Sequence, residues 1–305
     1  MSFIPRYLIC TALCACILIA GCSVPGGREP DIISGTTGDL AVHFIDVGQG
    51  DSALVRSRSG EWIMIDAGGK NEYIYDDVLS PYFKYRRIKK IKTLIITHGH
   101  LDHYAGVLRM IESGVQIEKI MAASPDSAET EYKRLVMNIK KHGVKFETAR
   151  AGNEIYFNGA VLNFLWPDPD FIKNSDFISE NDRSVVFKLS YMGKTFLFSG
   201  DISEKVENLL IKSKCDLSST VYKAAHHGSK TSNSEGFINA VKPETTYISS
   251  GYMNRFGHPH IEALKRLESA SNDVIISSKT GAVSFELKNE KCRMLDYAGN
   301  VIKLL

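Results

Sequence analysis

The sequence predicts an α/β fold in which two β-sheets form a sandwich covered by helices. Short apolar runs typical of strands gather in two groups, and longer amphipathic segments lie between and outside them. The composition agrees, because 44% hydrophobic and 24% charged residues are ordinary values for a globular protein. The formal net charge of only +2 does not indicate a nucleic-acid binder by itself.

The first group of strands precedes two predicted helices. Separated by glycine-containing turns, strands are expected over 40–47, 53–57, 61–67 and 92–97. Helices are expected over 104–113 and 126–142, the second because Leu135, Val136 and Ile139 recur at helical spacing.

The second group begins with a hairpin that turns at Met192-Gly193, between 184–191 and 194–200. Further strand-like runs cover 220–228 and 245–251, which end in polar, glycine-containing loops. Two more, 273–278 and 282–287, follow a helix. The segments 203–213 and 261–270 are predicted to be helices of this half.

Residues 1–22 form a segment of a different kind. Arg6 precedes an apolar run over 7–20 that is shorter than the roughly 20 residues of a membrane span. The end of the run, Leu-Ile-Ala-Gly-Cys, resembles the lipobox of bacterial lipoproteins, which implies cleavage before Cys22 and lipidation of that cysteine. An uncleaved anchor helix is the alternative.

Residues 23–38, rich in Gly, Pro, Ser and Thr, are expected to be a flexible tether, and 39–305 to be one domain. We therefore expect an exported protein, lipid-anchored to a bacterial membrane and facing the periplasm or the cell exterior. Which membrane holds it stays open. Cys215 and Cys292 can form a disulfide in such a compartment or remain unpaired.

The stretch THGHLDH (97–103) holds three of the nine histidines of the chain. His98 and His100 are two residues apart after a strand, so both imidazoles can reach one metal ion. Asp102 and His103 follow across the turn and face a second position. Imidazole and carboxylate groups together suit zinc, iron or manganese.

Further candidate ligands follow strands of the second group. Asp201 ends the segment LFSGD, and the pair His226-His227 lies in KAAHHGS. A carboxylate placed after such a strand can bridge two cations, and one histidine of the pair can complete the second site.

These motifs resemble the metallo-β-lactamase superfamily, in which HxHxDH is followed by a downstream Asp and His. More narrowly, the chain resembles the soluble domain of ComEC-type competence proteins through six segments in the same order: 43–55, 62–69, 97–103, 197–201, 223–234 and 251–260. The resemblance implies an αββα fold with two mixed sheets, a dinuclear metal centre and metal-assisted hydrolysis, with phosphoesters as plausible substrates.

The resemblance also implies roles for single residues. His98 and His100 would bind one metal ion, Asp102 and His103 the other, and Asp201 would bridge them. The last ligand would be His227, which we favour, or His226. Asp66 would fix a ligand imidazole by accepting its free N–H, and it can also cap the turn after its strand.

One ligand of the broad superfamily has no counterpart. A histidine usually lies between the first motif and the bridging Asp, and the only one here is His142, which we interpret as a surface residue. ComEC-like proteins resemble this chain in having Asn-x-x-Ser instead, here Asn181 and Ser184. The first metal ion would then have open positions for water or substrate, and its identity, Zn or Mn, stays undecided.

The function predicted from this resemblance is hydrolysis of phosphoester bonds by water activated between two divalent metal ions, with DNA or RNA as a candidate substrate. Asp102 would accept the proton of the attacking water. His226 and His258 would hold a phosphoryl oxygen or protonate the leaving group, and Ser229 and Lys230 would help to bind phosphate. For His258, the alternative is a turn residue before Pro259.

Two alternatives stay open. The enzyme could act on a phosphodiester in a lipid, a choline-bearing polymer or a nucleotide, or the protein could be a non-catalytic lipoprotein that binds DNA during uptake. The basic, aromatic segment 82–92 is compatible with a nucleic-acid backbone, with anionic lipid or with a solvated helix face.

Overall fold

The computed structural model describes residues 38–123, 129–174 and 179–305, all within one compact unit. The predicted signal segment 1–22 with Cys22, and nearly all of the predicted tether, lie outside the described residues. No helix in the described part of the chain is long and apolar enough to cross a membrane.

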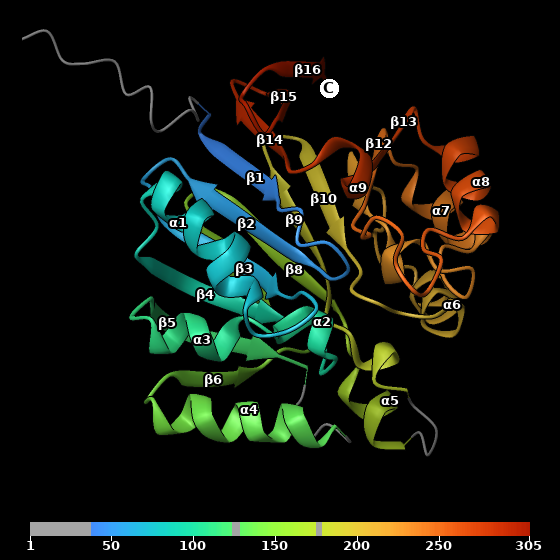
Figure 1. Cartoon of the computed structure of the whole chain (residues 1–305). Coiled ribbons are helices and arrows are strands. Elements are labelled where there is room, and N and C mark those ends of the chain that lie inside the picture. The colour runs from blue at the N-terminus through green and yellow to red at the C-terminus, as the bar shows by residue number, and fades with distance from the viewer. Residues whose placement is uncertain (1–37, 124–128, 175–178) are drawn as a thin grey trace, which may run out of the picture. The chain divides into compact units, whose positions relative to one another are not determined.

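The described residues form two mixed β-sheets, which confirms the predicted sandwich (Figure 1). The nine-stranded sheet contains, in spatial order, β16 (Val301–Leu304), β15 (Lys291–Asp296), β14 (Val283–Lys288), β1 (Leu40–Phe44), β2 (Ser52–Ser57), β3 (Trp62–Ala67), β4 (Lys90–Ile96), β5 (Gln116–Ala122) and β6 (Lys145–Thr148). The seven-stranded sheet contains β13 (Asp273–Ile276), β12 (Thr245–Ile248), β11 (Val221–Lys223), β10 (Lys194–Phe198), β9 (Val186–Tyr191), β8 (Ala160–Trp166) and β7 (Glu154–Phe157).

Aromatic side chains fill the space between the sheets. Phe44 of β1 stacks on Tyr247 of β12 with ring centroids 4.4 Å apart, and Phe198 of β10 lies 5.7 Å from the same ring of Phe44. The outer face of each sheet packs against its own helices in a separate apolar cluster. Strands with two covered faces bury nearly all their side chains, which explains why five of the six residues of β3 are apolar.

The helices cover the two outer faces and give the αββα order. Their bounds are α1 (Ser80–Arg86), α2 (Leu101–Tyr104), α3 (Val107–Glu112), α4 (Thr130–Lys141), α5 (Pro169–Asn174), α6 (Glu204–Lys212), α7 (Glu235–Val241), α8 (Ile261–Ala270) and α9 (Ser277–Thr280). A π-helical turn covers Tyr75–Leu79, and 3₁₀ turns cover Asn181–Arg183 and Ala225–Gly228.

The predicted hairpin and the predicted helix over 104–113 had different outcomes. The hairpin is confirmed: Met192 and Gly193, at φ 46° and 74°, join β9 to β10, as a tight turn with two left-handed residues requires.

The helix is divided into α2 and α3, because Gly106 donates its N–H to the Ala67 carbonyl (2.9 Å) and bends the chain onto the end of β3. Of the helix predicted over 126–142, residues 126–128 lie outside the described residues.

The parallel strands determine where the polar loops meet. β3 runs parallel to β4, and β10, β11 and β12 run parallel to one another. The carboxyl ends of parallel strands lie at the same edge, so the loops that follow them bring distant segments together. Asp66, the THGHLDH motif, Asp201 and the HHG turn all lie at or just after such strand ends.

Candidate metal centre

Asp66 fixes the start of the histidine motif. It is fully buried at the end of β3, with a left-handed φ of 55°. Its carboxylate accepts hydrogen bonds from the Thr97 amide at 2.7 Å and the Thr97 hydroxyl at 2.8 Å. The loop that carries the histidines is therefore held against β3 at its first residue.

His103 lies on α2, with its two ring nitrogens facing opposite sides. Nδ1 donates to Asp66 Oδ2 at 2.8 Å, which turns Nε2 towards Asp201 Oδ2 at 3.4 Å. Burial by itself lowers the pKa of His103, but the carboxylates of Asp201 and Asp66 outweigh it and raise this pKa well above the ordinary value. Asp66 thus contacts the His103 ring in addition to holding Thr97.

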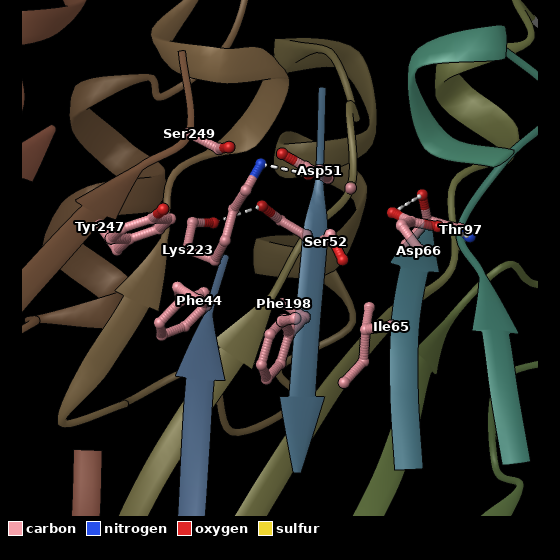
Figure 2. A pocket seen from close by; sticks show the side chains of 13 residues that line it. Phe44, Asp51, Ser52, Ile65, Asp66, Thr97, Phe198, Lys223, Tyr247 and Ser249 are labelled. Atoms are coloured by element: carbon pink, nitrogen blue, oxygen red, sulfur yellow. Dashed lines mark hydrogen bonds and ion pairs between the residues drawn. The ribbon is translucent and has the colours of Figure 1, made fainter. Parts of the chain in front are cut away.

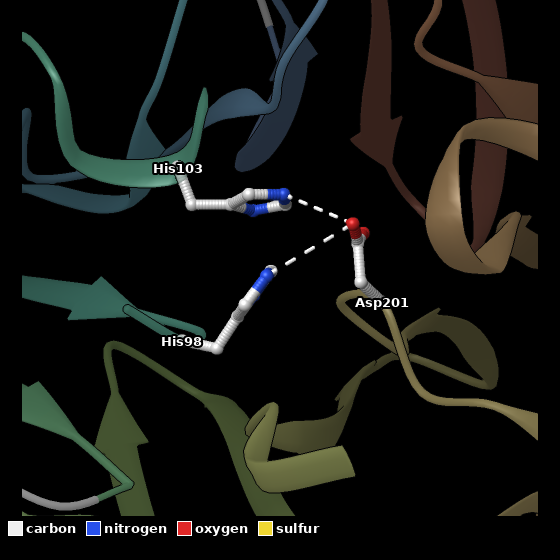
Figure 3. A group of neighbouring side chains, drawn as sticks. All are labelled: His98, His103 and Asp201. Carbon is white, nitrogen blue, oxygen red and sulfur yellow. Dashed lines mark ion pairs between the residues drawn. The ribbon is translucent and has the colours of Figure 1, made fainter. Parts of the chain in front are cut away.

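His98 and His100 lie side by side. His98 Nε2 is 3.0 Å from His100 Nδ1 and 4.0 Å from Asp201 Oδ2. Figure 3 shows His98 and His103 converging on Asp201 from the same side of the centre. His98 is buried and His100 is half-buried, so His100 lies on the outer side of the pair.

Asp201 is the carboxylate on which the histidines converge. Its Oδ2 lies 3.4, 3.5, 3.9 and 4.0 Å from the Nε2 atoms of four histidines, respectively His103, His227, His226 and His98. The Asp201 amide donates to Ser184 Oγ at 3.0 Å. Gly200, at φ +51°, lets the chain pass so close to Ser184 that a Cβ there would lie 2.7 Å from the Ser184 Cβ.

The HHG turn presents two imidazoles because two successive residues are left-handed. His226 and His227 have φ 51° and 54°, a conformation that costs free energy in residues other than glycine. Asn233 holds this turn: its Oδ1 accepts from the Ala225 amide at 3.0 Å, and its Nδ2 donates to the Ala225 carbonyl at 2.9 Å.

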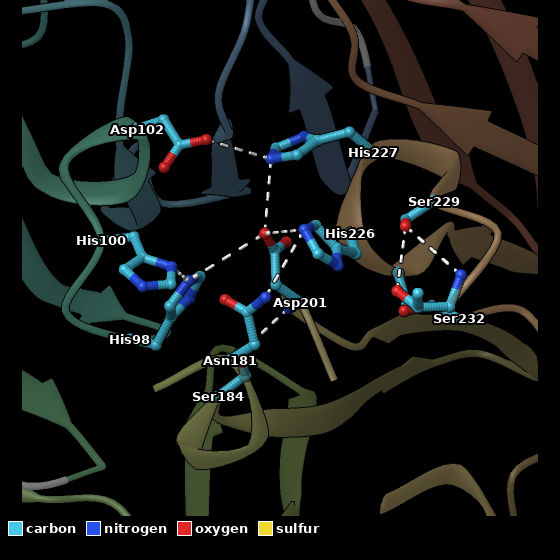
Figure 4. Close-up of polar contacts among 12 residues, drawn as sticks. His98, His100, Asp102, Asn181, Ser184, Asp201, His226, His227, Ser229 and Ser232 are labelled. Carbon is cyan, nitrogen blue, oxygen red and sulfur yellow. Dashed lines mark hydrogen bonds and ion pairs between the residues drawn. The ribbon is translucent and has the colours of Figure 1, made fainter. Parts of the chain in front are cut away.

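The two histidines of this turn differ in exposure and partners (Figure 4). His227 is buried, donates from Nδ1 to the Ser249 carbonyl at 2.9 Å, and places Nε2 3.4 Å from Asp102 Oδ2. His226 keeps a quarter of its side chain exposed and lies 3.4 Å from Asn181 Nδ2. This geometry favours His227 as the ligand and leaves His226 facing the solvent side.

Among the described residues, four sets of side chains have ligand atoms close enough to hold a metal ion; two contain Asp51, and the other two consist of predicted ligands and share His103. One set is His98, His103 and Asp201; the other is Asp102, His103 and His227, and the ligand atoms in each lie within 4.8 Å of one another. Five of the six predicted ligands therefore meet in these sets, and the sixth, His100, contacts His98.

The sequence reasoning assigned no role to a buried ion pair beneath these sets. Asp51 pairs with Lys223 (Figure 2), and its Oδ1 lies 3.4 Å from His227 Nδ1 and its Oδ2 3.9 Å from His103 Nδ1. Burial raises the pKa of Asp51, but Lys223 and His227 outweigh it and lower this pKa to about 2. The only sequence signal was the position of both residues inside segments that carried the family resemblance.

The remaining predicted residues lie in three different places. His258 is next to the centre, with its ring centroid 5.4 Å from that of His226, and burial together with neighbouring histidines lowers its pKa to about 4. The Ser229 hydroxyl bonds to the Thr231 hydroxyl at 3.0 Å instead of facing the centre. Lys230 is exposed, and its amide donates to His260 Nδ1 at 3.1 Å.

Two secondary expectations also have an outcome. His142 is exposed at the end of α4, as predicted for a surface residue. Cys215 and Cys292 are free thiols in the structure, the first half-buried and the second buried.

Comparisons with known proteins agree with this geometry. Residues 45–252 match the model of the metallo-beta-lactamase superfamily. The chain is 27% identical over 263 residues to ComE operon protein 3 of Bacillus subtilis (strain 168), covering 81% of this chain and 33% of that protein. It is 29% identical over 250 residues to competence protein ComA of Neisseria gonorrhoeae, covering 82% and 32%. The chain thus spans about a third of the length of these relatives.

A solved structure shows the same fold at low sequence identity. The metallo-beta-lactamase fold protein YhfI from Bacillus subtilis superposes with a TM-score of 0.52 at 10% identity, covering 81% of this chain and all of that one. The family model matches well over half of the chain, and the candidate ligand sets lie at or just after strand ends. The chain therefore belongs to the metallo-beta-lactamase superfamily.

Proposed function

We propose that the protein is a metal-dependent hydrolase of phosphoester bonds and that its substrate is DNA or RNA. The observation that carries the proposal is the convergence of buried imidazole nitrogens and carboxylate oxygens on Asp201. The relatives named as competence proteins support a substrate related to DNA.

The residues of the centre fit a pair of divalent cations. Among the described residues, several buried atoms have no hydrogen-bond partner, including His103 Nε2, His227 Nε2 and Asp201 Oδ1. The charges also favour cations, because in the described part of the chain the four carboxylates of Asp51, Asp66, Asp102 and Asp201 are accompanied by one lysine, Lys223, which pairs with Asp51. Buried negative charges need positive charge close by. The raised pKa values of His103 and His227 indicate that these two histidines are protonated, and so provide that charge, when no cation is bound.

We assign His98 and His100 to one cation and Asp102, His103 and His227 to the other, with Asp201 between them. Imidazole and carboxylate ligands suit Zn²⁺ or Mn²⁺. When bound, two such ions act as Lewis acids that stabilise a phosphoryl oxygen and lower the pKa of water, so that water can attack as hydroxide at neutral pH.

The protein side chains have distinct roles in this proposal. Asp66 and the Ser249 carbonyl hold the Nδ1 atoms of His103 and His227, so that both Nε2 atoms face the centre. Ser184 fixes the backbone of Asp201. These contacts preorganise the site, so that little rearrangement is needed when substrate binds.

The exposed side of the centre is where the phosphoester would bind. Asp102 keeps 28% of its side chain exposed and is assigned to accept the proton of the attacking water. His226 and His258 have lowered pKa values, because burial disfavours their charged forms. Both are then neutral at pH 7 and can donate one N–H to a phosphoryl oxygen or to the leaving oxygen.

The location of the protein is a second part of the proposal. Cleavage and lipidation at Cys22 would anchor the domain 39–305, through the tether 23–38, to the outside of a bacterial membrane. A phosphodiester in a lipid, a choline-bearing polymer or a nucleotide is the alternative substrate for an enzyme placed there.

A panel of phosphoesters tests the proposed reaction. The full-length chain, supplied with Mn²⁺ or Zn²⁺, is expected to cleave plasmid or single-stranded DNA faster than glycerophosphodiester lipids and choline phosphoesters, and EDTA is expected to abolish the activity reversibly. Cleavage of the lipid or choline substrates alone would favour the alternative substrate. If no phosphoester is cleaved by protein that holds metal, the proposed reaction is wrong.

A further inference from the structure

The loop over 251–258, which joins β12 to α8, presents large apolar side chains to solvent beside the metal centre. Tyr252 is 81% exposed, Met253 85% and Phe256 47%. Single exposed apolar residues are common, but three within five residues at the margin of a candidate active site indicate a binding surface. We call residues 251–258 the aromatic loop.

The aromatic loop is held in one conformation by Asn254. The Asn254 amide group donates to the carbonyls of Gly251 at 2.9 Å and His258 at 2.6 Å, and its Oδ1 accepts from the amides of Phe256 at 3.2 Å and His258 at 3.0 Å. Four hydrogen bonds from one side chain close the loop on itself. The exposed rings are therefore presented by a fixed backbone, which lowers the entropic cost of binding.

Both ends of the aromatic loop are attached to neighbouring segments. At its start, Gly251 donates its amide to Gln49 Oε1 at 3.3 Å, and a Cβ on Gly251 would lie only 2.8 Å from the Gln49 amide nitrogen. Beyond its end, the His260 amide donates to the carbonyl of Gly228, in the HHG turn, at 2.9 Å. The position of the loop is thus tied to that of the ligand histidines.

A row of stacked groups connects the exposed part of the loop to the centre. The Arg255 guanidinium lies 4.7 Å from the centroid of the Phe256 ring. Phe256 stacks on His258 with centroids 5.6 Å apart and an interplanar angle of 20°. His258 stacks in turn on His227, at 6.1 Å and 28°. A planar group stacked beside the Arg255 guanidinium would continue this row outwards.

We propose that the aromatic loop binds a nucleobase of a single-stranded nucleic acid whose neighbouring phosphodiester lies at the metal centre. Every base has a π-face that stacks on Tyr or Phe regardless of sequence, and an arginine beside the ring can contact the backbone phosphate. In a duplex these faces are covered by neighbouring bases, so the loop selects single strands. This inference rests on the proposed function and adds a specificity determinant to it.

A binding measurement without hydrolysis tests the aromatic loop. Full-length chain in EDTA is titrated into a fluorescein-labelled 12-nucleotide DNA strand, and into an abasic strand of the same length, and anisotropy is followed. Tyr252→Ala and Phe256→Ala are each expected to raise the Kd for the normal strand roughly 5- to 100-fold, the range of base–aromatic stacking. The Kd for the abasic strand should change less than twofold, because its phosphates remain and its bases are absent.

Matched variants make the result specific to this loop. Tyr156→Ala removes another exposed tyrosine (74%), on β7, and is expected to leave both Kd values unchanged. Phe256→Tyr keeps a ring and should restore binding. Because EDTA prevents metal-dependent hydrolysis, a failure of the proposed reaction would leave this result intact.

Three outcomes would overturn the inference. The first is equal loss of binding to normal and abasic strands, because the loop would then act by charge alone. The second is unchanged binding in both Ala variants. The third is a loss of binding to vesicles of anionic phospholipid with DNA binding unchanged, which would identify the exposed rings as a membrane contact.

Discussion

Replacing Asp201 by asparagine is expected to lower phosphoester hydrolysis by about 10³-fold or more. Asp201 Oδ2 lies within 4.0 Å of the Nε2 atoms of four histidines, and no other carboxylate oxygen in the described residues is recorded with so many. Metal ions contribute several kcal/mol of transition-state stabilisation, and each 1.36 kcal/mol changes the rate tenfold. An amide keeps the shape of the carboxylate but loses its charge.

The same variant has a second expected effect, on stability. Saturating metal should raise the unfolding midpoint of the wild-type chain, because a ligand at about 100 times its Kd adds about 2.7 kcal/mol per site. Asp201→Asn should lose most of this metal-induced rise. Asp216→Asn is the matched control, because this carboxylate is exposed and pairs with Lys188 outside the centre; it should retain both activity and the rise. Normal hydrolysis by Asp201→Asn would show that the chemistry lies elsewhere.

Replacing Lys223 by methionine is expected to destabilise the metal-free protein by about 3–5 kcal/mol. Lys223 and Asp51 are each less than a tenth exposed, so the variant leaves the Asp51 carboxylate buried without its main cation. Breaking a buried pair on one side costs about this much, whereas removing both charges costs far less. The double variant Asp51→Asn, Lys223→Met should therefore be more stable than Lys223→Met alone.

Urea unfolding of the metal-free full-length chain measures both values. Lys92→Met is the matched control, because the ion pair of Lys92 with Glu61 is about two-fifths exposed and should contribute less than about 1 kcal/mol. If Lys223→Met costs no more than this control, or if the double variant is no more stable than Lys223→Met alone, Asp51 and Lys223 do not depend on each other as the structure indicates.

The local part of the site could be predicted from the sequence. One strand end determines where His98, His100, Asp102 and His103 lie, because all four follow β4 directly. The strand itself ends in the apolar run Leu94–Ile96. The hairpin could be predicted for the same reason, because its turn is formed by two adjacent residues, Met192 and Gly193. The fold class followed from two groups of such strands.

The long-range part could not be predicted in the same way. Asp51 and Lys223 are 172 residues apart, and nothing in either segment indicates that their side chains meet. The difference between His226 and His227 depends on two left-handed residues held by Asn233, which is a property of the folded turn. Between residues 143 and 166, β6 and β7 are only four residues long and carry charged side chains, so neither has a clear strand pattern.

The central claim is that this cluster binds two divalent cations, and the metal content of the protein tests it most directly. The full-length chain is loaded with Mn²⁺ or Zn²⁺, freed of unbound metal by dialysis, and analysed by mass spectrometry for metal per chain. We expect two ions per wild-type chain and at most one in Asp201→Asn. A wild-type chain that retains no metal, or no more than Asp201→Asn does, would contradict the claim.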